Sequence, residues 1–235
     1  MNKKIVVTGG TKGIGRAIIE KFCSQGFDAI SCSRNQEELD RLKKEVEGSY
    51  PGIKLHVFKA DLSRKEEVAA FAEFVKSNDL APDVLVNNTG VFIPGQVHTE
   101  EEGVLEQMID TNLYSAYRLT RHLVGEMIDR KAGHIFNMCS IASITAYNNG
   151  GSYSISKFAM LGMSKALREE LKDKGIRVTA IMPGATLTAS WDGVDIPPER
   201  FMKSEDVAEA CWAAWQMSGH SVVEELVIRP QLGDL

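Results

Sequence analysis

Two residues of the segment 152–157 have side chains whose spacing could support proton transfer. Tyr153 and Lys157 are four positions apart, which on a helix places them on one face, one turn from each other. Lowering the pKa of a phenol from about 10 to about 7 requires roughly 4 kcal/mol of preferential stabilisation of the phenolate. An ammonium about 4 Å away supplies an interaction of that size at an effective dielectric of about 20. The pair is a candidate acid and base, unless it is simply an exposed tyrosine beside a solvated lysine.

The pattern along the chain indicates which elements position this pair. Short runs rich in β-branched residues alternate with longer amphipathic stretches, which is typical of right-handed crossovers and a parallel sheet. We expect strands at residues 4–8, 27–33, 53–60, 83–87, 133–139, 176–182 and 222–228. We expect helices at residues 14–25, 36–47, 64–77, 100–131, 152–174 and 205–216.

This order predicts an α/β fold with a doubly wound, seven-stranded parallel sheet and helices on both faces. The 235 residues, 43% of them hydrophobic, are expected to form one domain, 1–235. The longest segment outside the pattern spans about residues 184–204. Because it follows the carboxyl end of a strand, we interpret it as a variable substrate loop rather than as disorder.

Composition argues against several classes of protein. A net charge of −5 and a pI of about 5.6 give no overall support to a nucleic-acid or anionic-membrane partner, and no apolar stretch reaches membrane-spanning length. The four cysteines are widely spaced, which favours reduced thiols and a cytoplasmic location. The five histidines lack the spacing of metal ligands, so no metal site is expected.

The segment Thr8-Gly-Gly-Thr-Lys-Gly-Ile-Gly15 lies between the first expected strand and helix. Its glycines would allow a tight turn and let backbone N–H groups and the positive end of the helix approach a pyrophosphate. The spacing of Gly9, Gly13 and Gly15 is G-x-x-x-G-x-G. We interpret the segment as a dinucleotide-binding loop, the alternative being a flexible surface turn.

The end of the second expected strand indicates which nicotinamide cofactor is bound. A carboxylate there would accept hydrogen bonds from the adenosine ribose and repel a 2′-phosphate. This chain has Ser33 and Arg34 at that position, and Lys12 in the glycine loop. Two cations without a carboxylate favour NADP(H), although Arg34 could also serve only as the start of a solvated helix.

Taken together, these motifs resemble the short-chain dehydrogenase/reductase family (SDR), which has a Rossmann fold. The resemblance covers essentially the whole chain, with every motif in order. Two departures are visible: Thr89 replaces an alanine of the family pattern, and the C-terminal segment 222–235 differs from the commoner glycine-rich ending. The resemblance rests on Thr8–Gly15, Asp61-Leu62, Asn87-Asn-Thr-Gly90, Asn112, Ser140, Tyr153, Lys157 and Pro183-Gly184.

The resemblance implies catalytic roles for four residues. Ser140 would donate a hydrogen bond to the substrate carbonyl oxygen as negative charge develops, and Tyr153 would exchange a proton with that oxygen. Lys157 would hold the nicotinamide ribose and keep the phenol acidic. Asn112 would hold a water linked to Lys157 and complete a proton relay.

It also implies a set of residues that contact the cofactor. Asp61 would hydrogen-bond the adenine amino group, with Leu62 beside the ring, and residues after the sixth strand would border the nicotinamide. The full set is Gly9, Thr11, Lys12, Gly13, Ile14, Gly15, Ser33, Arg34, Asp61, Leu62, Asn88, Gly90, Tyr153, Lys157, Pro183, Gly184, Thr186 and Thr188.

The resemblance leaves the small-molecule substrate open. A 3-oxoacyl-carrier-protein reductase would dock an acidic partner on basic residues at element ends, namely Arg130, Lys131, Lys172 and Lys174. A sepiapterin-reductase-like enzyme could fold its C-terminal tail over the cleft, so that Asp234 pairs with a pterin, unless the tail is frayed. A small diketone is a further candidate, and a non-catalytic NADP-sensing or scaffold protein is the alternative from another class.

Relatives of this family pair two long helices between subunits. In this chain those are residues 100–131 and 152–174, which predicts a homodimer or a homotetramer. Leu161, Met163 and Leu167 are candidate interface residues, although packing within one subunit would explain the same apolar positions.

Overall fold

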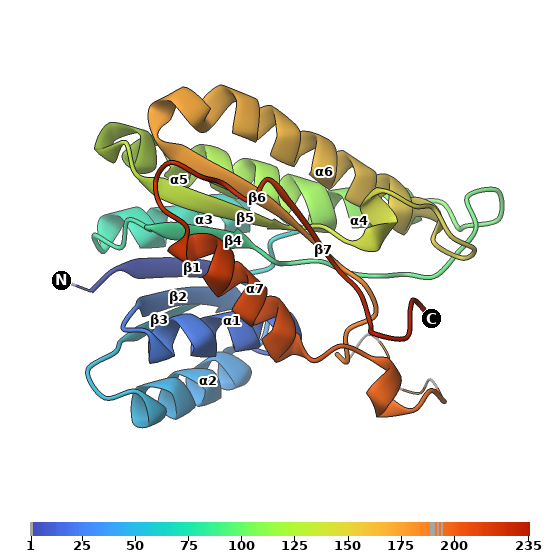
Figure 1. Ribbon diagram of the computed structural model, residues 1–235, viewed down its shortest axis with the longest axis horizontal. Helices are drawn as coiled ribbons and strands as arrows, with labels where there is room; N and C mark the ends of the chain where they lie inside the picture. Colours follow the sequence, from blue (N-terminus) through green and yellow to red (C-terminus); the bar gives the residue numbers. More distant parts are fainter. Residues whose placement is uncertain (1, 189–190, 192, 194) are drawn as a thin grey trace.

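The computed structural model describes residues 2–188, 191, 193 and 195–235, and it contains a seven-stranded sheet in which every neighbouring pair is parallel (Figure 1). The strand order is β3-β2-β1-β4-β5-β6-β7, which confirms the doubly wound sheet predicted from the alternation. The strands are β1 (Lys4–Thr8), β2 (Asp28–Ser33), β3 (Leu55–Lys59), β4 (Val84–Asn87), β5 (Gly133–Met138), β6 (Ile176–Pro183) and β7 (Glu225–Ile228).

Helices cover both faces of this sheet. Figure 1 shows α1, α2 and α7 on one face and α3, α4, α5 and α6 on the other. Their bounds are α1 (Gly13–Ser24), α2 (Gln36–Ser49), α3 (Lys65–Ser77), α4 (Val104–Ile109), α5 (Ser115–Arg130), α6 (Gly151–Leu171) and α7 (Ser204–Gln216). Within the described ranges, no helix is both long enough and apolar enough to cross a membrane.

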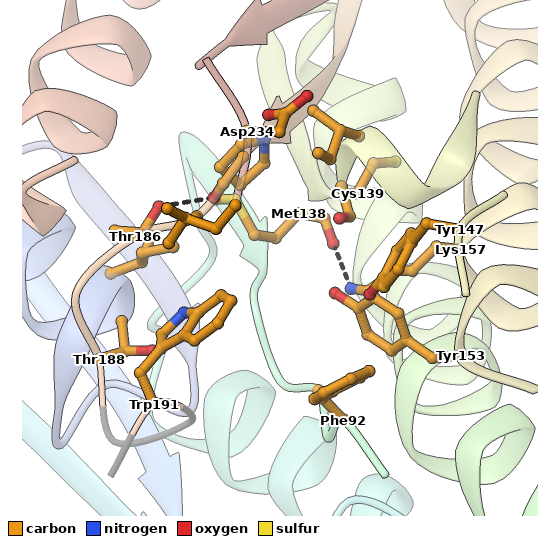
Figure 2. A pocket seen from close by; sticks show the side chains of 18 of the residues that line it. Phe92, Met138, Cys139, Tyr147, Tyr153, Lys157, Thr186, Thr188, Trp191 and Asp234 are labelled. Carbon is orange, nitrogen blue, oxygen red and sulfur yellow. Dashed lines mark hydrogen bonds between the residues drawn. The ribbon is translucent and has the colours of Figure 1, made fainter. Parts of the chain in front are cut away.

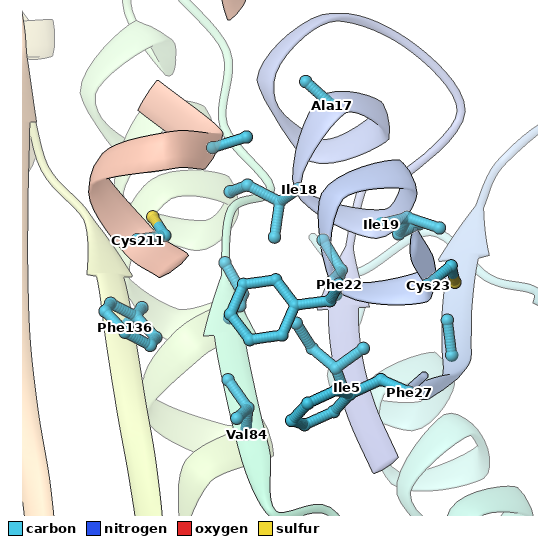
Figure 3. Packing of buried hydrophobic residues seen from close by; sticks show 14 of the residues in the cluster. Ile5, Ala17, Ile18, Ile19, Phe22, Cys23, Phe27, Val84, Phe136 and Cys211 are labelled. Carbon is cyan, nitrogen blue, oxygen red and sulfur yellow. The ribbon is translucent and has the colours of Figure 1, made fainter. Parts of the chain in front are cut away.

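Side chains of β1 pack into a separate core on each face. Ile5 and Val7 join the cluster under α1 and α7, whereas Val6 joins the cluster under α3 and α5, as the two-residue period of a strand requires. Figure 3 shows Phe22 of α1 in the middle of the first cluster, and its ring lies edge-on at 5.2 Å from that of Trp212 of α7. Burial on both faces explains why the strands are apolar runs.

The expectation of one long helix at residues 100–131 is wrong in two respects. Helical structure begins only at Val104, after Gly103 adopts a left-handed φ of 92°. The run is then interrupted by a π-helix, η1 (Asp110–Tyr114), before α5 ends at Arg130. The strand expected at residues 222–228 is also shorter and begins at Glu225.

The expected substrate loop, residues 184–204, is anchored at both of its ends. Thr186 forms a β-bridge with Met202, and the ring of Trp191 lies 5.0 Å from that of Phe201. A short 3-10 helix, η5 (Pro198–Arg200), lies between these contacts. Residues 189, 190, 192 and 194 of this expected loop lie outside the described residues.

Candidate active site

The strand order reverses between β1 and β4, and Asn88 joins the ends of these two strands. Asn88 Nδ2 donates hydrogen bonds to the backbone oxygens of Thr8 (2.9 Å) and Gly9 (3.2 Å). The Thr8 hydroxyl in turn accepts a hydrogen bond from the backbone N–H of Asn88 at 2.9 Å. Ligands of open α/β sheets bind in the crevice at such a switch point, and the glycine loop lies there.

The backbone of the glycine loop has a form that side chains would prevent. Gly9 and Gly13 adopt positive φ angles of 67° and 53°, where L-residues are strained. A Cβ on Gly15 would collide with the backbone oxygen of Gly9 and lie 2.5 Å from Asn88 Nδ2. Thr11 and Ile14 belong to the same segment, which leads from β1 into α1. Because its glycines carry no side chains, the backbone N–H groups of the loop can approach a phosphate. This glycine cradle fits the pyrophosphate of a dinucleotide.

The cations predicted to select NADP(H) lie at the ends of β1 and β2. Lys12 Nζ forms an ion pair with Glu38 Oε1 at 2.7 Å, and this partner together with the Thr11 hydroxyl lowers the pKa of the Glu38 carboxyl. Arg34 is exposed beyond the end of β2. Ser33 Oγ accepts a hydrogen bond from the Asn35 backbone N–H at 3.2 Å. A phosphate there would share Lys12 with Glu38.

Asp61 and Leu62 follow β3, and both have structural partners within the chain. Asp61 Oδ1 accepts hydrogen bonds from the N–H (3.1 Å) and hydroxyl (2.8 Å) of Ser63, so the carboxylate orders the turn before α3. Leu62 is 3% exposed and belongs to the core cluster on the α3 face. Their predicted adenine contacts stay predictions.

Ser140, Tyr153 and Lys157 line one cavity of about 580 Å³ at the carboxyl ends of β5 and β6. Figure 2 shows Tyr153 and Lys157 in its wall. Ser140 directly follows β5 and Cys139, whereas Tyr153 and Lys157 lie one turn apart on α6. Lys157 Nζ lies 5.7 Å from the centroid of the Tyr153 ring and donates a hydrogen bond to the backbone oxygen of Met138 at 2.8 Å. The predicted trio is therefore assembled in one place.

The pKa of Tyr153 is shifted in the direction opposite to the one predicted. Burial raises the pKa of the Tyr153 phenol, and only the hydrogen bond with Ser140 opposes this effect. Burial also lowers the pKa of Lys157. The predicted lowering of the phenol pKa is not found, because loss of hydration on burial outweighs the hydrogen bond with Ser140. With these shifts, Tyr153 keeps its proton as a neutral phenol, whereas Lys157 gives up its proton more readily than an exposed lysine would.

Asn112 lies in the π-helix η1 and is completely buried. Its Oδ1 accepts a hydrogen bond from the Val91 N–H at 2.7 Å, while its Nδ2 donates to Val91 O (3.0 Å) and Ser156 Oγ (2.9 Å). The side chain therefore fastens the loop after β4 to the helix of Tyr153. Oδ1 keeps a second lone pair, and Oδ1 and Lys157 Nζ lie 3.3 and 3.6 Å from the position that a Cβ on Gly90 would occupy. The water predicted between Asn112 and Lys157 stays a prediction.

The other predicted contacts of the nicotinamide surround the same cavity. Thr188 lies against the glycine loop: a Cβ on Gly13 would be 3.0 Å from Thr188 Cγ2. The Thr186 hydroxyl donates to the Gly184 oxygen at 3.0 Å, as Figure 2 shows. Residues in the cavity wall that were predicted as cofactor contacts are Ile14, Asn88, Gly90, Pro183, Gly184, Thr186 and Thr188.

Three aromatic side chains form walls that were not assigned from the sequence. Phe92 lies edge-on to Tyr153, with ring centroids 5.0 Å apart, and Tyr147 and Trp191 line the same cavity. Figure 2 shows Trp191 and Tyr147 on opposite sides of it. Phe92 lies two residues after the strand-end motif Asn87–Gly90, and this position was the signal that could have identified it.

The C-terminal tail reaches the cavity. Asp234 and Arg229 both line it, and Arg229 Nη1 forms an ion pair with Asp234 Oδ2 at 2.9 Å. The turn between them is closed by a hydrogen bond from Gly233 N–H to Pro230 O at 2.9 Å. Asp234 Oδ1 would lie 3.1 Å from a Cβ on Gly184. The tail is therefore fixed against the predicted nicotinamide border rather than frayed.

A sequence model of the short chain dehydrogenase family matches residues 3–196, which include the glycine loop, Ser140, Tyr153 and Lys157. The chain belongs to this family. As a short-chain dehydrogenase it is an oxidoreductase, and the Rossmann-type sheet and family resemblance predicted from sequence are confirmed.

Relatives of this short-chain dehydrogenase act on different carbonyl compounds. Sepiapterin reductase of Chlorobaculum tepidum is 30% identical over 241 residues, covering 100% of this chain and 99% of the relative. Diacetyl reductase of Staphylococcus epidermidis, which forms (S)-acetoin, is 31% identical and covers 89% of this chain and 80% of its own. The crystal structure of L-sorbose reductase from Gluconobacter frateurii, in complex with NADPH and L-sorbose, has a TM-score of 0.88 at 26% identity, covering 97% of this chain and 95% of that chain.

Proposed function

We propose that this short-chain dehydrogenase is an NADPH-dependent reductase of a small diketone or a pterin-type carbonyl. The observation that supports this proposal is a single cavity lined by Ser140, Tyr153 and Lys157. Aromatic side chains and the ion pair of Arg229 with Asp234 line the same cavity. When bound, NADPH supplies the hydride. All remaining steps belong to the residues of the chain.

Proton transfer is the task of Tyr153. Its raised pKa keeps the phenol protonated at neutral pH, so it can donate its proton to the carbonyl oxygen of the substrate as that oxygen gains negative charge. The Ser140 hydroxyl donates a hydrogen bond to the same oxygen. Lys157, whose pKa burial lowers, would return a proton to the phenolate and would then take one from solvent, which restores both groups for the next turnover.

The cofactor is NADP(H), and we assign each of its parts to residues of the chain. The glycine cradle would hold the pyrophosphate, and Lys12 and Arg34 would hold the 2′-phosphate. Lys157 would hold the nicotinamide ribose, and Pro183 and Gly184 would border the nicotinamide. Solved short-chain dehydrogenases similar to this chain were crystallised with NADP or NADPH.

The shape and polarity of the cavity favour a flat, polar substrate. Phe92, Tyr147 and Trp191 give aromatic faces on which a planar group can stack. Asp234 Oδ2 is occupied by Arg229, and its carboxylate is an acceptor for the amino group of a pyrimidine edge. These features support a pterin or a small diketone, the substrate types in the names of the sepiapterin and diacetyl reductases.

A 3-oxoacyl-carrier-protein substrate is less well supported. The basic residues considered for docking, Arg130, Lys131, Lys172 and Lys174, immediately precede β5 and β6. They therefore lie where these strands begin, at the opposite end of the sheet from Ser140 and Pro183, which lie at the carboxyl ends of the same strands. Arg130 is also bonded to the backbone oxygen of Pro82 at 2.6 Å.

The substrate is tested by measuring NADPH consumption with diacetyl, sepiapterin and a 3-oxoacyl thioester at equal concentrations. We expect kcat/KM for diacetyl or sepiapterin to exceed that for the thioester by at least about tenfold, which corresponds to about 1.4 kcal/mol. Asp234→Asn is the matched variant: it should lose more activity with sepiapterin than with diacetyl. A preference for the thioester would contradict the proposal, and a lack of turnover with all three would favour a non-catalytic NADP-binding protein.

A further inference from the structure

The first turn of α6 carries Tyr153 and needs support from outside the helix. Tyr153 is the third residue of α6, after Gly151 and Ser152. The first N–H groups of a helix have no partner within it, and helix ends fray unless they are capped. The residue at the N-cap is Gly150, which has no side chain to provide that cap.

Glu100, in the loop between β4 and α4, provides this cap. Its Oε1 accepts a hydrogen bond from the Ser152 backbone N–H at 2.9 Å, and its Oε2 accepts one from the Ser152 hydroxyl. Ser152 is only 2% exposed, which shields both bonds from water. A carboxylate at the amino end of a helix also interacts favourably with the helix dipole. Glu100 thus bonds to the residue immediately before Tyr153.

Two glycines allow Glu100 to approach this closely. A Cβ on Gly151 would collide with Glu100 Oε1 and lie 2.7 Å from the backbone oxygen of Gly95. A Cβ on Gly95 would lie 2.7 Å from Glu100 Cγ. In addition, the Gly95 N–H donates a hydrogen bond to Asn149 O at 3.1 Å. The loop is therefore built to fit against the start of α6.

The same loop contacts α6 at two further points. Phe92 packs edge-on against the Tyr153 ring at 5.0 Å. Val91 binds Asn112, which in turn donates to Ser156 Oγ. The loop therefore contacts α6 just before Tyr153, at Tyr153 itself and, through Asn112, one turn later at Ser156. Of these contacts, only the one at Ser152 is made by a carboxylate.

We propose that Glu100 is a positioning residue for the reaction, holding the first turn of α6 so that the Tyr153 hydroxyl faces the substrate oxygen. The inference rests on the proposed role of Tyr153 as the acid. It predicts a loss in kcat rather than in cofactor binding. The glycine cradle and Lys12 lie on other elements, and Lys157, the proposed contact of the nicotinamide ribose on α6, lies one turn beyond the capped residues.

Glu100→Ala and Glu101→Ala are the variants to compare with the wild type. Glu101 is the exposed neighbour in the same acidic run, so it serves as the matched control and should keep wild-type kinetics. For Glu100→Ala we expect kcat with diacetyl or sepiapterin to fall about 10- to 100-fold, the size of effect that follows from a misplaced catalytic group. The dissociation constant for NADPH, measured by fluorescence, should change less than about twofold, and Glu100→Gln, which keeps an acceptor for Ser152 N–H, should recover most of kcat.

A double-mutant cycle separates positioning from general destabilisation. If Glu100 acts through Tyr153, Glu100→Ala should cost nothing further in the residual turnover of Tyr153→Phe. The same loss in both backgrounds, or wild-type kcat for Glu100→Ala, would overturn the inference. Glu100→Asp, which withdraws the carboxylate by one methylene, replaces the alanine variant if that variant fails to fold. Full turnover by Tyr153→Phe would overturn the proposed function itself, whereas an inactive Tyr153→Phe beside a fully active Glu100→Ala would overturn only the role of Glu100.

Discussion

At the scale of residues, burial determines the chemistry of the pair Tyr153 and Lys157. Lys157 is buried and Tyr153 is partly buried in the cavity wall, and this loss of hydration disfavours the charged form of each: the pKa of Tyr153 is raised and that of Lys157 is lowered. Spacing alone suggested that the cation would dominate. The outcome instead suits a general acid for reduction, because the phenol retains its proton at neutral pH.

The pH dependence of carbonyl reduction follows from the raised pKa of Tyr153. The acid must be protonated to act, and its protonated fraction falls only as the pH rises through its pKa, which lies above the ordinary value of about 10. At saturating NADPH, kcat/KM for the carbonyl should therefore be flat from about pH 7 to 9 and decline only beyond that range. A decline centred near pH 7 would show that the cation dominates after all.

A matched control uses the second tyrosine of the cavity. Burial raises the pKa of Tyr147 to about 12, so its ionisation lies far from the range of the assay. Tyr147→Phe should leave the position of the alkaline decline unchanged, whatever its effect on the rate.

At the scale of elements, β5 and β6 are joined by a buried polar contact behind the site. Thr179 Oγ1 donates to Val223 O at 2.6 Å, so it can only accept the proton of His134 Nε2, which lies 2.7 Å away. His134 therefore carries a proton on Nε2. Burial, aided by the positive charge of Arg177, lowers the pKa of His134 to about 2.

His134 should make the fold sensitive to acid. Its pKa is depressed in the folded chain and near 6.5 in the unfolded chain, so its effect is absent above about pH 6.5. As the pH falls below that value the unfolded chain binds one more proton, and the free energy of unfolding should drop by about 1.4 kcal/mol per unit. In urea unfolding, the free energy of unfolding of the wild type should fall between pH 6.5 and 4.5 by about 2–3 kcal/mol more than that of His134→Gln, which lacks the titrating group. The same dependence of this free energy on pH in both proteins would contradict the prediction.

At the scale of the whole molecule, α5 and α6 leave aromatic and aliphatic side chains exposed on one face of the sheet. Tyr117, Ile155 and Phe158 are 43%, 42% and 46% exposed. The interface candidates taken from sequence are different: Leu161 is buried in the core, and Met163 and Leu167 pack against core clusters. Packing within the chain therefore explains these three positions, and the exposed residues are the better candidates for a contact between subunits.

We propose a homodimer formed through this exposed face. Phe158→Glu should shift the mass measured by light scattering from dimer to monomer at micromolar concentration, because an unpaired charge would be buried at the interface. Met217→Glu is the control: Met217 is equally exposed, at 46%, but lies at the end of α7 on the opposite face. A wild-type chain that is already monomeric, or a Phe158→Glu dimer, would contradict the proposal.

Much of the fold could be predicted because it depends on local patterns. Apolar runs such as Val84–Asn87 and the glycine loop have signals within a few residues. Features that depend on distant contacts could not be predicted. Examples are the cap that Glu100 gives to Ser152, the approach of Asp234 to Gly184, and the balance of burial and charge at Tyr153, each of which depends on segments far apart in the sequence.

The most direct test of the central claim is to compare NADPH binding and turnover in Tyr153→Phe. The variant removes one hydroxyl and keeps the ring that packs on Phe92, so the dissociation constant for NADPH should stay within about twofold of the wild type. Turnover of diacetyl or sepiapterin should fall about 10²- to 10⁴-fold, the usual contribution of a general acid. Wild-type turnover with intact NADPH binding would contradict the assignment of Tyr153 as the acid.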